Sequence, residues 1–354
     1  MYNKIYILHE YGANSHYRAL DYLAKKNNTE LVYREFSIVK NIIKAVVKFD
    51  LKLFTKQFIN VYFLLNLIFT KNKKIVLGIA PYDFRLIFLS FILKNHKVYY
   101  HTSWTCWDKS YFPKKLFVTD WLIAFWERFL QEDVIKIFAV TTQTKNELIN
   151  NLNINENKIN VVYHSFDNKV FKYFNNENIE LNFVYVGRLV LEKGIDEILD
   201  YFISHQNINL SIVGNGPLLE KVKSHATKYK NIEYLGYITD QEELVEIYNQ
   251  HNYLLLNSKK VGNWEELFGM VIIEAMACGV VPITTNHKGP IEIIKNKVDG
   301  YILSEKKYIK ELDMLIDNHS QNLYKNIQEQ ALNKAEKYTI KNISKKWENI
   351  LNER

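Results

Sequence analysis

The sequence has few of the features that mark disulfide-rich, secreted or membrane-spanning proteins. Its 354 residues include only two cysteines, Cys106 and Cys278, so no disulfide framework is implied and a reduced, cytoplasmic setting is expected. Residues 1–10 contain too short an apolar run for a signal peptide. The longest apolar stretch, residues 58–69, is interrupted by two asparagines and falls well short of the ~20 residues that span a bilayer.

Two further absences narrow the function. No Gly-x-Gly-x-x-Gly pattern follows the first expected strand, which disfavours a dinucleotide-dependent oxidoreductase. No basic tail and no nucleic-acid-binding motif is recognisable, although the net charge is +7. That charge favours anionic partners such as nucleotide phosphates or acidic lipid surfaces, but solvated lysine faces account for most of it.

The sequence does contain the pattern of a two-domain α/β protein. Hydrophobic residues make up 47% and charged residues 24%, which is typical of a globular chain, and the length suits two domains. In the first half, short β-rich runs alternate with helical patterns, which predicts a parallel sheet covered on both faces. The expected strands are 4–10, 30–36, 74–80, 97–103, 136–142 and 158–164, and the expected helices are 16–26, 39–70, 84–95 and 120–131.

The second half repeats this alternation. Strands are expected at 181–187, 207–214, 232–238, 253–257 and 280–284, and helices at 195–205, 217–229, 241–249, 270–278 and 290–294. We therefore predict an N-terminal domain (1–172), a C-terminal domain (173–335) and a terminal helix (336–354) that packs back on the first domain through a stripe including Trp347. Two doubly wound domains form a cleft, and ligands bind beyond the carboxyl ends of their strands.

The most informative stretch places Glu266 and Glu274 on either side of Gly269, where a loop enters an apolar helix. Eight helical steps rise about 12 Å, too far for the two carboxylates to share a proton. This spacing would let the two carboxylates bind opposite ends of one long ligand, such as a sugar and a ribose joined by a pyrophosphate. The alternative is a solvated acidic helix start that interacts with the helix dipole.

Other motifs in the second half also follow expected strands. Arg188 and Lys193 follow Gly187 and are placed to bind phosphate, Arg188 through its two-pronged guanidinium and Lys193 as a point charge. A surface loop with ion pairs is the alternative. Gly214 precedes a proline-started helix, which a tight turn explains equally well. The free N–H groups at the start of the helix after Gly269 provide an anion site.

These motifs occur together and in order: Gly-Arg-Leu…Glu-Lys-Gly, Gly-x-Gly-Pro, Leu-Gly-Tyr and Glu-x-Phe-Gly-x-x-x-x-Glu-Ala-Met-Ala-x-Gly. In this arrangement the chain resembles the retaining glycosyltransferases of the GT-B fold, glycosyltransferase family 4 (group 1). The resemblance covers most of the second half strongly and the first half loosely. It implies two Rossmann-like domains, with the donor nucleotide sugar bound by the second.

The resemblance also implies residue roles. Arg188 and Lys193 match the pair that neutralises the pyrophosphate, and Glu274 matches the glutamate that binds the ribose. Glu266 matches the glutamate at the sugar. The remaining expected donor-binding residues lie in the loops after the strands and at the helix start: Gly187, Gly214, Tyr237, Ile238, Phe268, Gly269, Met270 and Val271. No Asp-x-Asp motif is present and the family is typically metal-independent, so no metal or cofactor is expected.

The first half is expected to bind the acceptor. His101 ends an expected strand and matches a histidine that family members place by the donor sugar; a buried or surface histidine is the alternative. Gly12 and Ala13 stand where the family has a glycine-rich loop, but here only one glycine is present. Residues 36–74 alternate lysines with apolar residues and suit either an anionic membrane surface or a core helix pair with a solvated lysine face.

These observations predict a hexosyltransferase that extends a cell-surface glycan or lipid-linked glycan from a nucleoside-diphosphate sugar. It would work in the cytoplasm, and the inner face of the membrane is the second setting that the sequence allows. A nucleotide-sugar epimerase of related fold and a non-catalytic sugar-nucleotide-binding partner are the alternatives. The sugar, the base, the acceptor and the oligomeric state are left open.

Overall fold

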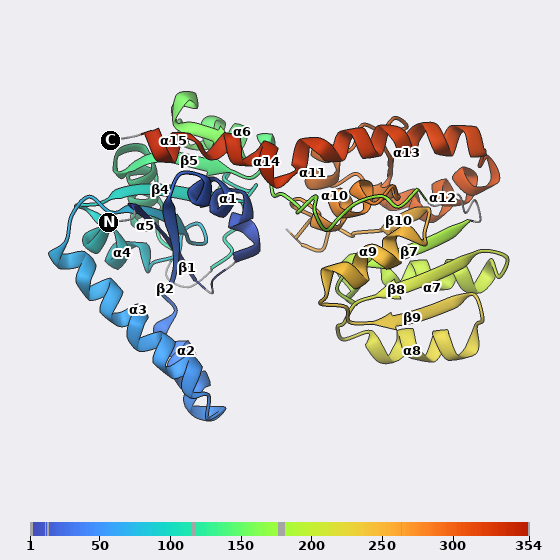
Figure 1. Cartoon of the computed structure of the whole chain (residues 1–354), viewed down its shortest axis with the longest axis horizontal. Helices are drawn as coiled ribbons and strands as arrows, with labels where there is room; N and C mark the ends of the chain where they lie inside the picture. Colours follow the sequence, from blue (N-terminus) through green and yellow to red (C-terminus); the bar gives the residue numbers. More distant parts are fainter. Residues whose placement is uncertain are drawn as a thin grey trace. The chain divides into compact units, whose positions relative to one another are not determined.

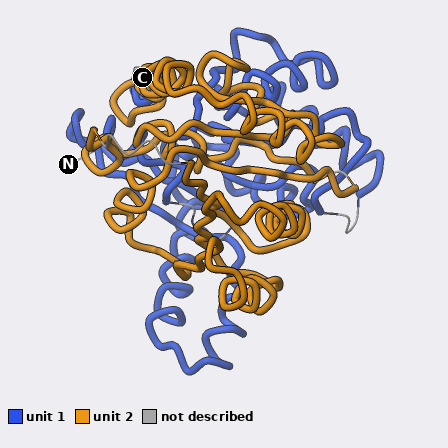
Figure 2. The backbone as a smooth tube through the Cα atoms, turned by 90° about the vertical axis from the view of Figure 1, so that its right-hand side faces the viewer, with its two compact units in different colours: residues 1–164, 343–354 blue, residues 165–342 orange. Residues whose placement is uncertain are grey.

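A computed structural model describes residues 3–10, 12, 14–114, 118–175, 181–262 and 264–352. The chain divides into two compact units (Figure 2). The first unit comprises residues 1–164 and 343–354, and the second unit comprises residues 165–342. The sequence placed these boundaries at 172–173 and 335–336.

The first unit contains a six-stranded parallel sheet in the order β2-β1-β3-β4-β5-β6 (Figure 1). Its strands are β1 (Asn3–His9), β2 (Thr29–Glu35), β3 (Lys74–Gly78), β4 (Lys97–Thr102), β5 (Val134–Ala139) and β6 (Ile159–Val161). Its helices are α1 (Arg18–Lys26), α2 (Ile38–Val47), α3 (Leu51–Phe69), α4 (Leu86–Leu93), α5 (Asp120–Arg128), α6 (Thr142–Leu152) and the terminal α15 (Asn349–Asn352). The expected parallel α/β architecture of this half is confirmed.

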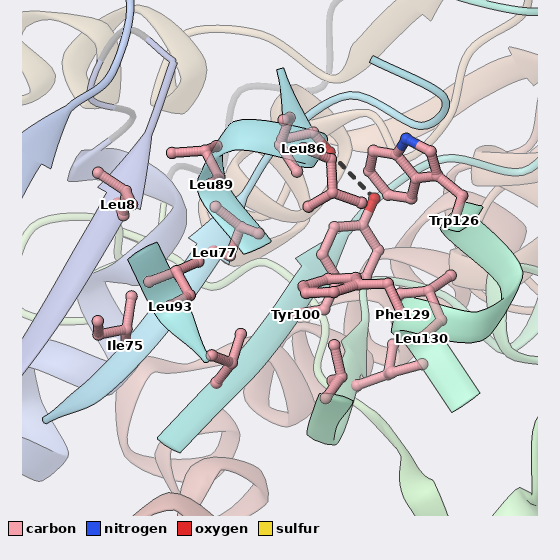
Figure 3. Packing of buried hydrophobic residues seen from close by; sticks show 14 of the residues in the cluster. Leu8, Ile75, Leu77, Leu86, Leu89, Leu93, Tyr100, Trp126, Phe129 and Leu130 are labelled. Atoms are coloured by element: carbon pink, nitrogen blue, oxygen red, sulfur yellow. Dashed lines mark hydrogen bonds between the residues drawn. The ribbon is translucent and has the colours of Figure 1, made fainter. Parts of the chain in front are cut away.

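The core of the first unit fills the space between its sheet and the helices that cover it. Buried leucine, isoleucine and aromatic side chains from β1, β3 and β4 meet those of α4 and α5 (Figure 3). The Tyr100 hydroxyl lies inside this core and donates a hydrogen bond of 3.0 Å to the Ile79 carbonyl, so its burial leaves no unsatisfied donor.

The terminal segment packs on the other face of this sheet. Trp347 is 1% exposed and its ring lies 4.3 Å from that of Phe138. Lys74 donates to the carbonyls of Ile350 (2.7 Å) and Leu351 (3.0 Å), which accounts for two of the carbonyls left open at a helix end. The expected return of the C-terminal helix to the first unit is confirmed.

The single helix expected over residues 39–70 is wrong in detail, because the structure contains two helices there. α2 ends at Val47, Phe49 has a positive φ of 51°, and α3 begins after Asp50. The Asp50 carboxylate caps α3 by accepting a hydrogen bond of 2.9 Å from the Leu53 N–H. Among the described residues, no helix combines the length and hydropathy needed to cross a membrane.

The second unit contains another six-stranded parallel sheet, in the order β12-β11-β10-β7-β8-β9. Its strands are β7 (Asn182–Val186), β8 (Asn209–Val213), β9 (Ile232–Gly236), β10 (Tyr253–Leu256), β11 (Val281–Thr285) and β12 (Tyr301–Leu303). Its helices are α7 (Ile195–Ser204), α8 (Leu219–Lys228), α9 (Gln241–Asn249), α10 (Met270–Ala277), α11 (Lys288–Ile293), α12 (Tyr308–Asp317), α13 (Gln321–Ala335) and α14 (Ile340–Ser344), the last of which reaches into the first unit. This is the doubly wound Rossmann strand order, so the order reverses between β7 and β10.

Candidate functional site

The point where the strand order reverses brings two loops of the second unit together. The loop after β7 contains Arg188 and Lys193, and the loop after β10 contains Glu266. Gly194 lets the two loops touch: its φ is +61°, and a Cβ there would lie 2.1 Å from the Asn257 carbonyl oxygen. In doubly wound sheets this crevice is where ligands bind.

Lys193 and Glu266 form an ion pair between these loops. Each of the two side chains is 13% exposed, so both are largely shielded from water. The Lys193 ammonium also lies 5.4 Å from the centroid of the Trp264 ring, and the Ser258 hydroxyl donates to the same Glu266 carboxylate at 3.4 Å. A cation and a carboxylate that the sequence separates by more than seventy positions therefore act as one group.

The loop after β11 holds the backbone of Glu266 in place through hydrogen bonds. The Glu266 N–H donates to Nδ1 of His287 at 3.0 Å, and Nε2 of His287 lies 3.0 Å from the Glu305 carboxylate. The backbone donor fixes Nδ1 as an acceptor, so the ring proton is on Nε2 and is donated to Glu305. The Gly289 N–H in turn donates to the Glu266 carbonyl at 3.0 Å.

Arg188 lies at the surface of this site. It is exposed and forms no ion pair with any residue in the described part of the chain. The Tyr185 hydroxyl donates to the Arg188 carbonyl at 2.7 Å and fixes the loop while leaving the guanidinium outside. Burial raises the pKa of Tyr185, and the nearby Glu266 raises it further, so this hydroxyl remains a donor.

The start of α10 provides N–H groups at the same loop. Gly269 precedes the helix with φ +89°, and Phe268 just before it is buried. The Met270 and Val271 N–H groups, in the first turn, have no carbonyl within the helix to donate to. Glu266 lies in the loop before α10, so the 12 Å helical spacing to Glu274 does not apply.

Glu274 lies on the inward-facing side of α10 and is 9% exposed. It is one of the charges that raise the pKa values of Tyr248 and Cys278, after the larger effect of burial. The Glu274 carboxylate is therefore embedded rather than part of the solvated acidic helix start that the sequence allowed.

Glycines hold the loops after β7, β8 and β9 side by side. The Gly187 N–H donates to the Val213 carbonyl at 3.0 Å, and the Gly214 N–H donates to the Gly236 carbonyl at 2.9 Å. A Cβ at Gly214 would lie 1.9 Å from the Gly187 carbonyl oxygen. Close packing alone therefore requires Gly214. Tyr237, directly after β9, is 66% exposed at the same edge and Ile238 is half-buried.

His101 lies in the first unit, at the end of β4, and is 6% exposed. Its Nδ1 is 3.1 Å from the Tyr17 hydroxyl. Burial, followed by the effect of neighbouring histidines, holds the pKa of His101 well below its ordinary value. Gly12 has φ +95° and lies near Glu35, whereas Ala13 lies outside the described residues.

Sequence reasoning did not identify the three histidines around His101. They come from the end of β1, the turn before α1 and the segment after β6, and they are His9, His16 and His164. The His16 and His164 rings lie 4.6 Å apart. In the described part of the chain, no group of three His, Cys, Asp or Glu side chains is arranged to hold a metal ion. Positions so far apart in the sequence carry no shared pattern that would have revealed this cluster.

Ser258 and Trp264 were also missed as neighbours of the Lys193–Glu266 pair. Trp264 directly precedes the Glu265–Glu266 dipeptide, so its position in the loop was visible in the sequence. Its proximity to Lys193 depends on how the loops after β7 and β10 pack, which the sequence does not show.

Comparison with known proteins finds similarity mainly in the second unit. Residues 166–334 match the sequence model of the family Glycosyl transferases group 1. The chain is 33% identical over 177 residues to the amylovoran biosynthesis glycosyltransferase AmsD of Erwinia amylovora, covering 47% of each chain. It is 28% identical over 208 residues to the capsular polysaccharide biosynthesis glycosyltransferase CapM of Staphylococcus aureus, covering 52% of this chain and 53% of CapM.

These curated relatives are matched over about half of their length. The fold is matched over the whole chain by the crystal structure of Anabaena HepE in complex with UDP, at a TM-score of 0.69 and 13% identity, covering 99% of both chains. Residues 166–334 therefore resemble the Glycosyl transferases group 1 family, within a chain that has the GT-B fold.

Proposed function

We propose that the chain transfers a hexose from a nucleoside-diphosphate sugar to a hydroxyl group of a glycan or lipid-linked glycan, with retention of anomeric configuration, in cell-surface polysaccharide synthesis. The observation that carries the proposal is the Lys193–Glu266 pair beside the exposed Arg188 at the reversal point of the second sheet. The printed names of CapM and AmsD support the setting, since both belong to polysaccharide biosynthesis.

The donor diphosphate would lie among Arg188, Lys193 and the first N–H groups of α10. Two cations and a helix N-terminus are a suitable environment for a diphosphate. When the bond from the anomeric carbon to the phosphate oxygen breaks, negative charge grows on the leaving nucleoside diphosphate, and these groups stabilise it. This arrangement lets protein cations do the work of a divalent metal, so chelation by EDTA is expected to leave transfer unchanged.

The two glutamates would hold the rings at either end of the donor. Glu274 would accept hydrogen bonds from the ribose hydroxyls, and the base would lie against the loop of Tyr237 and Ile238. Glu266 would accept a hydrogen bond from a sugar hydroxyl next to the reacting carbon. The acceptor oxygen would attack the same face that the leaving group departs from, and its proton would pass to the departing phosphate oxygen.

The Glu266→Gln variant tests the role of the carboxylate directly. We expect it to lose at least about 100-fold in transfer rate, a size typical of losing one key electrostatic group in an active site. The measurement is release of nucleoside diphosphate coupled to appearance of the glycosylated acceptor. Glu265→Gln is the matched control, because Glu265 pairs with Lys288 at 3.1 Å and not with Lys193.

Product analysis separates the candidate activities. Retaining transfer gives a product whose anomeric configuration, read by NMR coupling constants, equals that of the donor. An epimerase would release nucleotide and an altered free sugar without any acceptor. Tight donor binding with neither transfer nor hydrolysis across a broad acceptor panel would contradict an enzymatic role altogether.

A further inference from the structure

Helices α2 and α3 form a hairpin that projects from the sheet of the first unit (Figures 1 and 2). The hairpin turns at residues 48–50, and Phe49 at its tip is 92% exposed. Valine and leucine flank it: Val47 is 73% exposed and Leu51 is 78% exposed. Single exposed hydrophobic residues are common on protein surfaces. A contiguous group of large ones at the end of a projection is unusual and marks an interaction site.

The root of the hairpin is polar on the inside. Glu35, at the end of β2, is 6% exposed and accepts hydrogen bonds from Asn41 of α2 (3.2 Å) and Lys56 of α3 (2.6 Å). Gln57 and Asn60, both on α3, are almost completely buried and hydrogen-bonded to each other at 3.2 Å. The side chains that would normally face water are thus turned inward.

The outside of the hairpin is apolar. Along α3, exposed apolar residues recur at the three- and four-residue spacing of one helical face. Together with those of α2 they form what we call the hairpin stripe: Val39, Ile43, Val46, Val47, Phe49, Leu51, Phe58, Tyr62, Leu65 and Phe69, all at least half exposed. Phe63, Leu64 and Leu67 of α3 are buried in the core of the first unit, so the hairpin is anchored on one side and presents an apolar surface on the other.

The apolar surface continues onto α4. Phe88 and Phe91 are each about three-fifths exposed, at 59% and 58%. A groove of about 600 Å³ lies between α3 and α4 and is lined by Leu64, Ile87 and Phe88 among others. The exposed apolar surface therefore extends beyond the hairpin stripe onto α4.

Basic charge accompanies the hairpin stripe. Residues 38–69 contain five lysines and a single acidic residue, Asp50, whose carboxylate caps α3. Lys44, Lys48 and Lys52 are exposed and form no ion pair within the described residues. Lysines interspersed with aromatic and aliphatic side chains are complementary to an anionic lipid surface, where the apolar groups enter the acyl boundary and the ammonium groups meet the headgroups.

We infer that the α2–α3 hairpin docks the protein on an anionic membrane, with Phe49 and its neighbours entering the interface and Lys44, Lys48 and Lys52 contacting lipid phosphates. A second copy of this chain fits less well, because pairing two hairpins would bring two sets of unpaired lysines together. The inference does not depend on the proposed sugar transfer, and its test reads binding and not activity.

The test is flotation of the full chain with vesicles on a density gradient. At low salt we expect binding to vesicles of phosphatidylcholine mixed with phosphatidylglycerol, weak binding to phosphatidylcholine alone, and release at high salt. Replacing Lys44, Lys48 and Lys52 by Gln is expected to weaken binding about 100-fold, at about fivefold for each lysine. The control replaces three exposed lysines of the second unit, Lys306, Lys310 and Lys325, and is expected to bind normally.

The apolar contribution is tested by Phe49→Ser with Leu51→Ser, which we expect to weaken binding at least about tenfold. Both positions are so exposed that folding is expected to be unchanged. Met314→Ser with Leu323→Ser, which are 57% and 47% exposed, is the control. Failure of the intact chain to float with anionic vesicles overturns the inference. A self-association that the Phe49 and Leu51 replacements abolish, without vesicle binding, also overturns it and assigns the hairpin stripe to a second copy.

Discussion

Gly214 shows how a single position can look like ligand chemistry in the sequence and be explained by packing in the structure. Its φ is +154°, and the Gly187 carbonyl oxygen occupies the space of a side chain there. We predict that Gly214→Ala lowers the free energy of unfolding by about 2–4 kcal/mol, because the neighbouring loop must move. Urea denaturation measures this change.

Gly187→Ala is the matched comparison for Gly214→Ala. A Cβ at Gly187 meets the Tyr185 hydroxyl at 3.5 Å, which is ordinary van der Waals contact. The Gly187→Ala variant is expected to lose less than about 1 kcal/mol in the free energy of unfolding. Equal losses in the two variants would refute the packing explanation.

The histidines around His101 give the first unit a pH-dependent stability. Burial lowers the pKa of His9 to about 4 and that of His164 to about 3. Since an unfolded histidine titrates near 6.5, the unfolded chain takes up protons first as the pH falls. The contribution of the neutral, buried histidines to the free energy of unfolding is therefore present above about pH 6.5 and is lost as the pH drops toward 4.

Unfolding by urea at pH 7 and at pH 5 measures the effect. Replacing His164 by Phe keeps an aromatic ring beside His16 and removes one titrating group. The variant is expected to flatten the pH dependence by up to about 1.4 kcal/mol per pH unit between pH 6.5 and 4. Parallel profiles for the variant and the parent chain would contradict this account.

At the scale of elements, the terminal segment is part of the core of the first unit. Trp347 packs against Phe138 and lies 5.5 Å from the His101 ring. We predict that Trp347→Ala destabilises the first unit by about 3–5 kcal/mol, the usual cost of emptying a large aromatic site. Trp121→Ala, at a position that is 61% exposed, is the control and is expected to change little.

The sequence predicted the bounds of elements well where apolar periodicity is strong. It predicted them poorly where a single capping residue determines where an element begins. Helix α9 was predicted with its observed bounds, and the strands of the second sheet shifted by only one or two residues at their ends. The break between α2 and α3 was missed because the apolar pattern runs through it, and only the Asp50 cap marks the new start. β12, a strand of three residues, was not predicted.

The candidate site was partly predictable for the same reason. Loops after parallel strands converge at one edge, so the proximity of Arg188, Lys193 and Glu266 followed from strand order alone. Their individual contacts did not. That Lys193 pairs with Glu266, and that His287 receives the Glu266 N–H, depends on side-chain packing across three loops.

At the scale of the whole molecule, the proposed nucleotide-sugar donor is expected to stabilise the two units unequally. If the nucleotide binds only at the second unit, a nucleoside diphosphate at about 100 times its dissociation constant adds about 2.7 kcal/mol to that unit. Exchange of the backbone amide hydrogens should then slow within residues 165–342. In residues 3–164, which do not contact the nucleotide in this proposal, exchange should stay unchanged.

Arg188→Gln is expected to reduce this protection, because the exposed guanidinium lies free to bind phosphate. A screen of several nucleoside diphosphates identifies the base at the same time. Protection confined to the first unit would place the nucleotide elsewhere and contradict the proposed site.

Gly289 has a consequence for efforts to change the sugar of the proposed transfer. A Cβ at this position would lie 2.4 Å from the Phe268 nitrogen, so any side chain there displaces the main chain just after Glu266. Mutant libraries aimed at new donor preference should keep this glycine fixed. Variation belongs at neighbouring positions whose side chains can change without moving the backbone that carries the carboxylate.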